Sequence, residues 1–111
     1  MGKAAACETK LQKQEDAWLS LDTLFGHMYA FSNTMVNGKL LKKVLARTGK
    51  AIDDMMDLGV AMSLWPDVYG NGFRARHLIE SHGEERIAPI VNDIEANGGQ
   101  FIYSTRVTEA V

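Results

Sequence analysis

Apolar side chains recur every three or four positions over residues 20–31 and again over residues 38–58, the spacing that builds one face of an α-helix. In the first stretch Ser20 is placed to cap the helix, because its hydroxyl can accept a hydrogen bond from an amide of the first turn. In the second stretch Asn37 has the same role, and Gly59 suits the left-handed position that follows a helix end. The predicted buried stripe of this second helix comprises Leu41, Val44, Leu45, Thr48, Ile52, Met55 and Met56.

A third helix is expected over residues 85–97, with Pro89 in its first turn, where a missing amide costs little. Its predicted buried face comprises Ile87, Ile90, Val91 and Ile94. Alternating apolar residues predict short strands over residues 60–64 and 100–104. Between them, residues 65–83 are rich in glycine and predict a long loop.

These elements predict an α+β fold, mostly helical with two or three short strands, in a single domain or domain fragment spanning residues 1–111. Residues 8–19 either extend the first helix or form a separate arm. The strand at residues 100–104 follows a helix and a Gly-Gly turn, which is half of a βαβ unit, and no later element would cover it. We therefore expect an incomplete piece of a larger α/β domain.

The composition excludes several classes of protein. The 111 residues are 46% apolar, and the formal net charge of −2 gives no bulk attraction for nucleic acid or for an anionic membrane. No run of about 18 apolar residues is present, so we expect no membrane span. Cys7 is the only cysteine, so no internal disulfide can form, and we expect a cytoplasmic protein with a free thiol.

The cluster formed by Arg74, Arg76 and His77 is the candidate for anion binding. On a glycine-rich loop, two guanidinium groups and an imidazole could clamp a carboxylate or a phosphate. The alternative is an ordinary solvated loop. From the residues alone we favour this alternative, because charged side chains on loops are mostly exposed.

Neither metal nor thiol chemistry is favoured by the sequence. His77 and His82 are five residues apart, and no Cys-x-x-Cys or His-Glu-x-x-His pattern is present, so we interpret both as surface or loop histidines. Cys7 lies near the terminus, among alanines and without an identifiable base, which favours a structural thiol over a nucleophile. We therefore predict no metal ligands and no catalytic residues.

Three segments carry a family resemblance through their order and spacing. They are Glu8–Gln12 after a Gly-Lys-Ala-Ala start, Asn37–Leu41 continuing through Ile52–Val60, and Ile90–Val107 with its Gly-Gly turn. Together they resemble the FAD-dependent oxidoreductases of the fumarate reductase, flavocytochrome c and ketosteroid dehydrogenase type. The resemblance covers nearly the whole chain.

The resemblance implies an internal segment of such a flavoprotein, within a larger FAD-binding α/β domain. Val107 matches a position whose backbone meets the adenine of FAD in this family, and Lys3, Ala4 and Ala5 match the stretch that passes the flavin. The parent protein would pass a hydride between FAD and an activated alkene. The chain contains no G-x-G-x-x-G fingerprint and no residue that matches the family's catalytic positions, so we expect no complete reaction from it alone.

Two functions stay open at this point. The first is a partial or truncated FAD-dependent oxidoreductase whose partner is the rest of a flavoprotein. The second is a small helical protein–protein interaction module without enzymatic activity, which binds a partner or a second copy of itself. The apolar stripe of residues 38–58 and the six methionines support the second function, because methionine suits adaptable interfaces.

Overall fold

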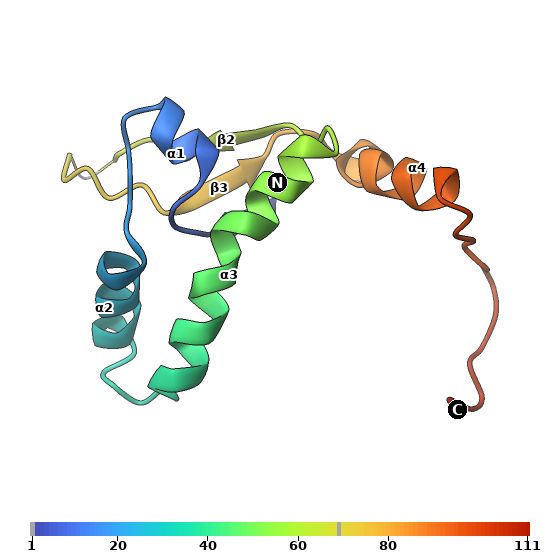
Figure 1. Ribbon diagram of the computed structural model, residues 1–111, viewed down its shortest axis with the longest axis horizontal. Helices are drawn as coiled ribbons and strands as arrows, with labels where there is room; N and C mark the ends of the chain where they lie inside the picture. Colours follow the sequence, from blue (N-terminus) through green and yellow to red (C-terminus); the bar gives the residue numbers. More distant parts are fainter. Residues whose placement is uncertain (1, 69) are drawn as a thin grey trace.

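The computed structural model describes residues 2–68 and 70–111, so Met1 and Tyr69, the latter within the predicted loop, lie outside the description. These residues form an α+β fold, as predicted. Figure 1 shows the elements in chain order. They are β1 (Gly2–Ala5), α1 (Lys10–Gln14), α2 (Leu21–Phe31), α3 (Gly38–Asp57), β2 (Met62–Leu64), β3 (Arg76–Ile79), the short 3-10 helix η1 (Gly83–Arg86) and α4 (Ala88–Ala96).

The described strands form one antiparallel sheet in the order β1-β3-β2. His77 of β3 pairs with Ala4 of β1 on one side and with Leu64 of β2 on the other. The prediction of an uninterrupted loop over residues 65–83 is therefore wrong, since β3 lies within it. The β1 strand was not predicted either, because Gly-Lys-Ala-Ala has little intrinsic preference for a strand and its pairing partner is remote in sequence.

The helices α2 and α3 form a hairpin that packs beside the sheet (Figure 1). Their first turns have the predicted caps, because Ser20 Oγ accepts from the Thr23 amide and Asn37 Oδ1 from the Leu40 amide. Gly59 has the predicted left-handed backbone, with φ of 101°. Residues 10–14 form the separate helix α1, which settles the alternative left open for residues 8–19.

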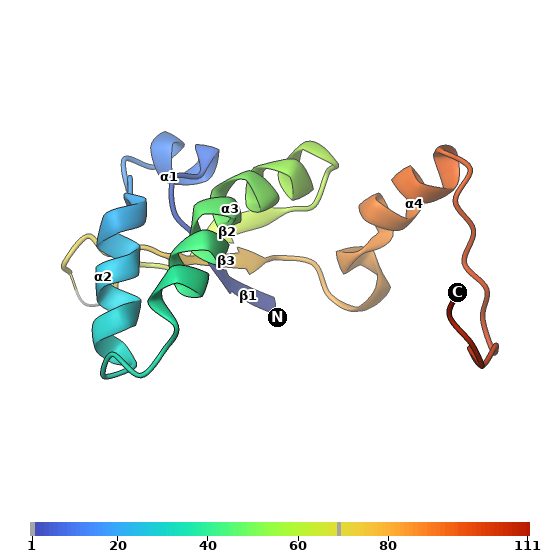
Figure 2. The same cartoon turned by 60° about the horizontal axis from the view of Figure 1, so that its bottom comes forward.

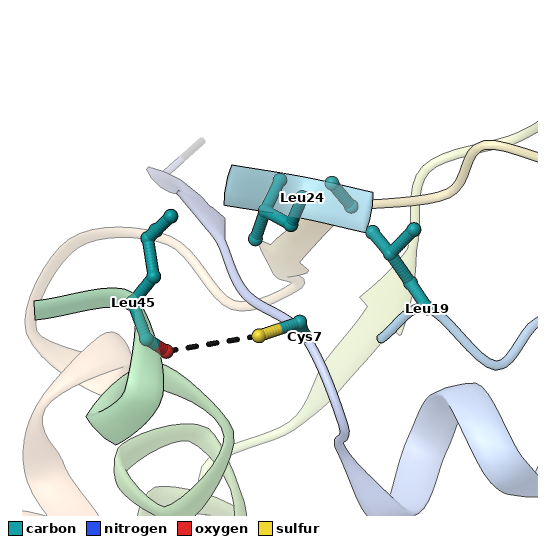
Figure 3. Packing of buried hydrophobic residues seen from close by; sticks show 5 residues of the cluster. Cys7, Leu19, Leu24 and Leu45 are labelled. Carbon is teal, nitrogen blue, oxygen red and sulfur yellow. Dashed lines mark hydrogen bonds between the residues drawn. The ribbon is translucent and has the colours of Figure 1, made fainter. Parts of the chain in front are cut away.

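The core lies between this hairpin and the segment that follows β1 (Figure 3). Its buried residues are Cys7, Leu19, Leu24, Leu45 and Ala75. The Cys7 thiol is 3.7 Å from the Leu45 carbonyl oxygen, to which it donates a weak hydrogen bond. On α3 the predicted stripe is correct at Leu45 and Ile52 but wrong at Val44, which is exposed because it lies toward the outer side of the helix.

The chain after β3 leaves the sheet and packs little against it (Figures 1 and 2). The predicted helix over residues 85–97 is divided into η1 and α4, and Pro89 lies in the first turn of α4 as expected. Its predicted buried face is wrong, because Ile87 and Ile94 are exposed and α4 has no buried residue. Residues 100–104 form no strand and are exposed, since no described strand runs beside them.

Among the described residues, no helix is both long enough and apolar enough to cross a bilayer.

Candidate functional site

A pocket of about 270 Å³ opens between the end of β1, the inner side of α2 and the segment that joins β2 to β3. Ala5 contributes from β1, and Leu24, His27, Met28 and Phe31 contribute from α2. The joining segment and the start of β3 supply the other described lining residues: Trp65, Pro66, Val68, Asn71, Phe73, Arg74, Ala75 and Arg76. The walls are therefore mainly apolar and aromatic, with two arginine residues at the β3 side, which is the usual character of a small-molecule site.

Aromatic rings give this pocket flat surfaces. The ring centroids of His27 and Phe73 lie 4.3 Å apart, so a ring on α2 contacts a ring on the joining segment. The Lys3 ammonium lies 4.2 Å from the centroid of the Trp65 ring, a cation–π contact that holds the indole from the β1 side. Aromatic rings in the pocket lining favour a flat ligand, because ring faces stack on planar conjugated groups.

Arg74, one of the three candidates for anion binding, is tied into the protein by its own partners. Its Nη2 lies 2.7 Å from Oε2 of Glu15, so the guanidinium already has a carboxylate partner. Its Nε donates to the Trp65 carbonyl oxygen over 3.1 Å. Arg74 therefore joins α1 to the end of β2 and fixes the position of Trp65 in the pocket wall.

His77 does not line the pocket and is fully buried, so it is not placed to complete an anion clamp with Arg76. Successive side chains of a strand lie on opposite faces, and Arg76 is exposed whereas His77 is fully buried. The interpretation of His77 as a surface or loop histidine is also wrong, because β3 is the central strand. Of the three candidates for anion binding, Arg76 alone is an exposed residue of the pocket lining.

The buried polar groups behind the pocket form one satisfied network. His77 Nδ1 is 3.1 Å from the Ala75 carbonyl oxygen, which can only accept, so this nitrogen carries the proton of the neutral ring. His77 Nε2 then accepts from the Thr9 hydroxyl over 2.9 Å. The Gln12 side chain donates to the Arg74 carbonyl oxygen over 2.9 Å. The network connects α1 to the edge of the pocket, and burial lowers the pKa of His77 below its ordinary value.

The cofactor positions implied by the resemblance lie in two separate places. Ala5 lines the pocket, Lys3 contacts its Trp65 wall, and Ala4 is exposed between them on β1. Val107 lies in the exposed C-terminal segment, at the opposite end of the molecule from the pocket (Figure 1).

The pocket itself was missed from the sequence, as were Trp65, Phe73 and His27 as its wall residues. Pro66, Asn71 and the glycines around them indicated a loop but gave no sign of which helix it faces.

The described residues contain no group of histidine, cysteine and acidic side chains that could hold a metal ion. Burial raises the pKa of the Cys7 thiol, which makes it a poor nucleophile at neutral pH.

Comparison with protein-family models, with curated proteins and with solved structures finds no match to this chain.

Proposed function

We propose that the chain is a segment of an FAD-dependent oxidoreductase of the fumarate reductase type and that its pocket forms one wall of the site for the flavin ring. One observation carries the proposal. The pocket gathers Ala5, from the stretch that the resemblance places along the flavin, with the aromatic residues Trp65 and Phe73 and the exposed cation Arg76.

The shape and chemistry of the pocket suit the ring end of the cofactor. A flavin ring is flat and largely apolar, so Trp65 and Phe73 can bind its faces and exclude water from them. Arg76 can pair with a phosphate on the side chain of the flavin. The volume of about 270 Å³ lies near the lower limit of small-molecule pockets, roughly 300 Å³, which supports binding of a ring system and not of a whole dinucleotide.

The residues do not fit the diphosphate of FAD. That group is normally held by a glycine-rich turn between a strand and a helix N-terminus, and the sequence has no such turn. FAD supplies hydride-transfer chemistry when it is bound. We infer that these residues bind and orient the ring, that the diphosphate is held by other groups, and that the chain alone completes no reaction. A cytoplasmic location belongs to the same proposal and is supported by the lone reduced Cys7.

Flavin titration of the full chain tests this proposal. We expect saturable quenching of FMN fluorescence, because stacking on Trp65 quenches the flavin. Trp65→Ala and Arg76→Gln should each weaken binding, whereas the matched variants Trp18→Ala and Arg106→Gln, which change exposed residues outside the pocket, should not. The affinity for riboflavin, which has no phosphate, should be the same in the Arg76→Gln variant as in the unchanged protein. Absence of quenching by the folded chain, or equal quenching by Trp65→Ala, would contradict the proposal.

A protein–protein interaction module is the second candidate, and the C-terminal third of the chain favours it. Exposed apolar side chains follow one another from η1 to the end: Ile87, Ile94, Phe101, Ile102, Tyr103 and Val107. Such a run is typical of a surface that a partner covers. Sedimentation equilibrium in the absence of flavin tests this function. Self-association that is lost in an Ile102→Ser, Tyr103→Ser variant supports the module. A molecular mass that stays at that of the monomer at every concentration gives no support for a module that binds a second copy of itself.

A further inference from the structure

The α2–α3 hairpin carries a concentration of positive charge that the net charge of the chain conceals. Between Asp22 and Asp53 the sequence contains no acidic residue and five basic ones. All five lie on α3: Lys39, Lys42, Lys43, Arg47 and Lys50. The net charge of −2 therefore says little about the field at this end of the molecule.

The basic side chains lie on one face of the helix. At about 100° per residue, they fall within an arc of about 140°, which contains none of the buried positions of α3. Lys42 is paired with Asp22 and Lys50 with Asp54. None of the ion pairs among the described residues engages Lys39, Lys43 or Arg47, all of which are exposed. The first three turns of α3 therefore present uncompensated positive charge.

Exposed apolar side chains lie beside this charge. Leu40 and Val44 continue the same outer face of α3 next to Arg47, and both are more than half exposed. Phe31, at the end of α2, is 86% exposed, and Met35, in the turn between the helices, is 88% exposed. In Figures 1 and 2 this turn forms the end of the hairpin that points away from the sheet. Apolar and basic groups thus share a protruding edge.

We propose that this edge, formed by Phe31, Met35, Leu40, Lys39 and Lys43, binds the surface of an anionic lipid bilayer. Lysine ammonium groups bind anionic headgroups, while neighbouring apolar side chains enter the boundary between headgroups and acyl chains. Nucleic acid would engage the lysines but leave the protruding Phe31 and Met35 in water. A deformable lipid surface accommodates both kinds of side chain, so lipid is the occupant that fits. This surface meets the pocket only at Phe31, which belongs to both, and it needs no flavin.

Vesicle flotation with the full chain tests the proposal. We expect binding to phosphatidylcholine vesicles that contain about 30% phosphatidylserine, no binding to pure phosphatidylcholine, and weaker binding as salt increases. Lys39→Gln and Lys43→Gln should each lower the partition coefficient about fivefold. A Phe31→Ser, Met35→Ser variant should bind weakly even with both lysines present. Trp65→Ala should bind like the unchanged protein, which separates this surface from the pocket.

The matched control is Lys13→Gln, which removes the same single charge from an exposed position outside the hairpin. It should bind vesicles like the unchanged protein. Failure of the folded chain to bind anionic vesicles overturns the proposal, and so does an equal loss in the control variant. Binding of poly-dT that depends on Lys39 and Lys43 but not on Phe31 and Met35, together with absent vesicle binding, would identify a nucleic-acid surface instead.

Discussion

The Thr9 hydroxyl lies 2.9 Å from Nε2 of His77, and both side chains are fully buried. This hydrogen bond joins the cap of α1 to the central strand β3, residues that are far apart in sequence. Because the Ala75 carbonyl oxygen accepts from Nδ1, the geometry fits the neutral ring, and a second proton on Nε2 would break the hydrogen bond that the Thr9 hydroxyl donates to it. The pair therefore makes the fold sensitive to protonation of one histidine.

The first prediction concerns pH. Burial lowers the pKa of His77 in the folded chain below the ordinary value of 6.5, so below pH 6.5 the unfolded chain binds this proton more readily. The contribution of neutral His77 to stability is present above that pH and is lost as the pH falls toward the lowered pKa of the folded state. Urea unfolding between pH 7.5 and 5 should show a falling free energy of unfolding.

Two histidine variants separate the contribution of His77 to the pH dependence of stability from that of the carboxylates. His77→Gln should be less stable at pH 7.5 and should show a shallower fall in the free energy of unfolding on acidification. His82→Gln, which changes an exposed histidine, should keep the slope of the unchanged protein. Parallel slopes for His77→Gln and the unchanged protein would mean that His77 does not titrate as a buried neutral group.

The second prediction concerns two helical glycines with opposite surroundings. A Cβ at Gly49 of α3 would overlap the Cys7 carbonyl oxygen, whereas a Cβ at Gly26 of α2 would meet nothing within 4 Å. Gly49→Ala should therefore destabilise the chain by about 2 kcal/mol despite the better helix propensity of alanine. Gly26→Ala should stabilise it by up to about 1 kcal/mol. Urea midpoints measure both, and a stabilising Gly49→Ala would disprove the close approach of α3 to Cys7.

The third prediction concerns the thiol. Cys7 is 2% exposed, and burial raises the pKa of its thiol, so both access and ionisation limit its reactivity. The native chain should react with Ellman's reagent only at the slow rate set by opening of the core, and the rate should rise sharply in urea. Rapid stoichiometric labelling without denaturant would contradict the packing of Cys7 between Leu24 and Leu45.

The helices α2 and α3 were predictable because their signals are local. Ser20 and Asn37 cap the first turns, and the apolar spacing repeats within each helix. Where the capping residue, the apolar spacing and the residue that ends the helix all indicate the same element, a short segment is enough to predict that helix.

The sheet and the pocket were not predictable because they depend on pairing between distant segments. Ala4 pairs with His77, and neither segment has a strong preference for a strand by itself. The same pairing brings Ala5 beside Trp65 and Arg76, and it turns His77 into the core on the face opposite Arg76. A cluster of adjacent basic residues in the sequence is therefore divided between two faces, which the sequence order could not reveal.

The C-terminal third was mispredicted for a different reason. The apolar spacing of Ile87 and Ile94 and the β-prone residues Phe101 and Tyr103 indicate surfaces that favour burial, yet within the described residues they are exposed. A helix face or a strand is stable only against a neighbour, and no described element lies against these residues. The pattern therefore predicted a tendency to be buried and not the observed contacts.

Chemical-shift mapping of the ¹⁵N-labelled full chain during FMN titration tests the central claim most directly, because it reports both whether a flavin binds and where. The account predicts saturable shifts at amides around the pocket, among them Ala5, His27, Phe73 and Arg76, with those of α4 unchanged. Shifts confined to the C-terminal segment, or no shifts in the folded chain at saturating FMN, would contradict the assignment of this pocket to the flavin ring.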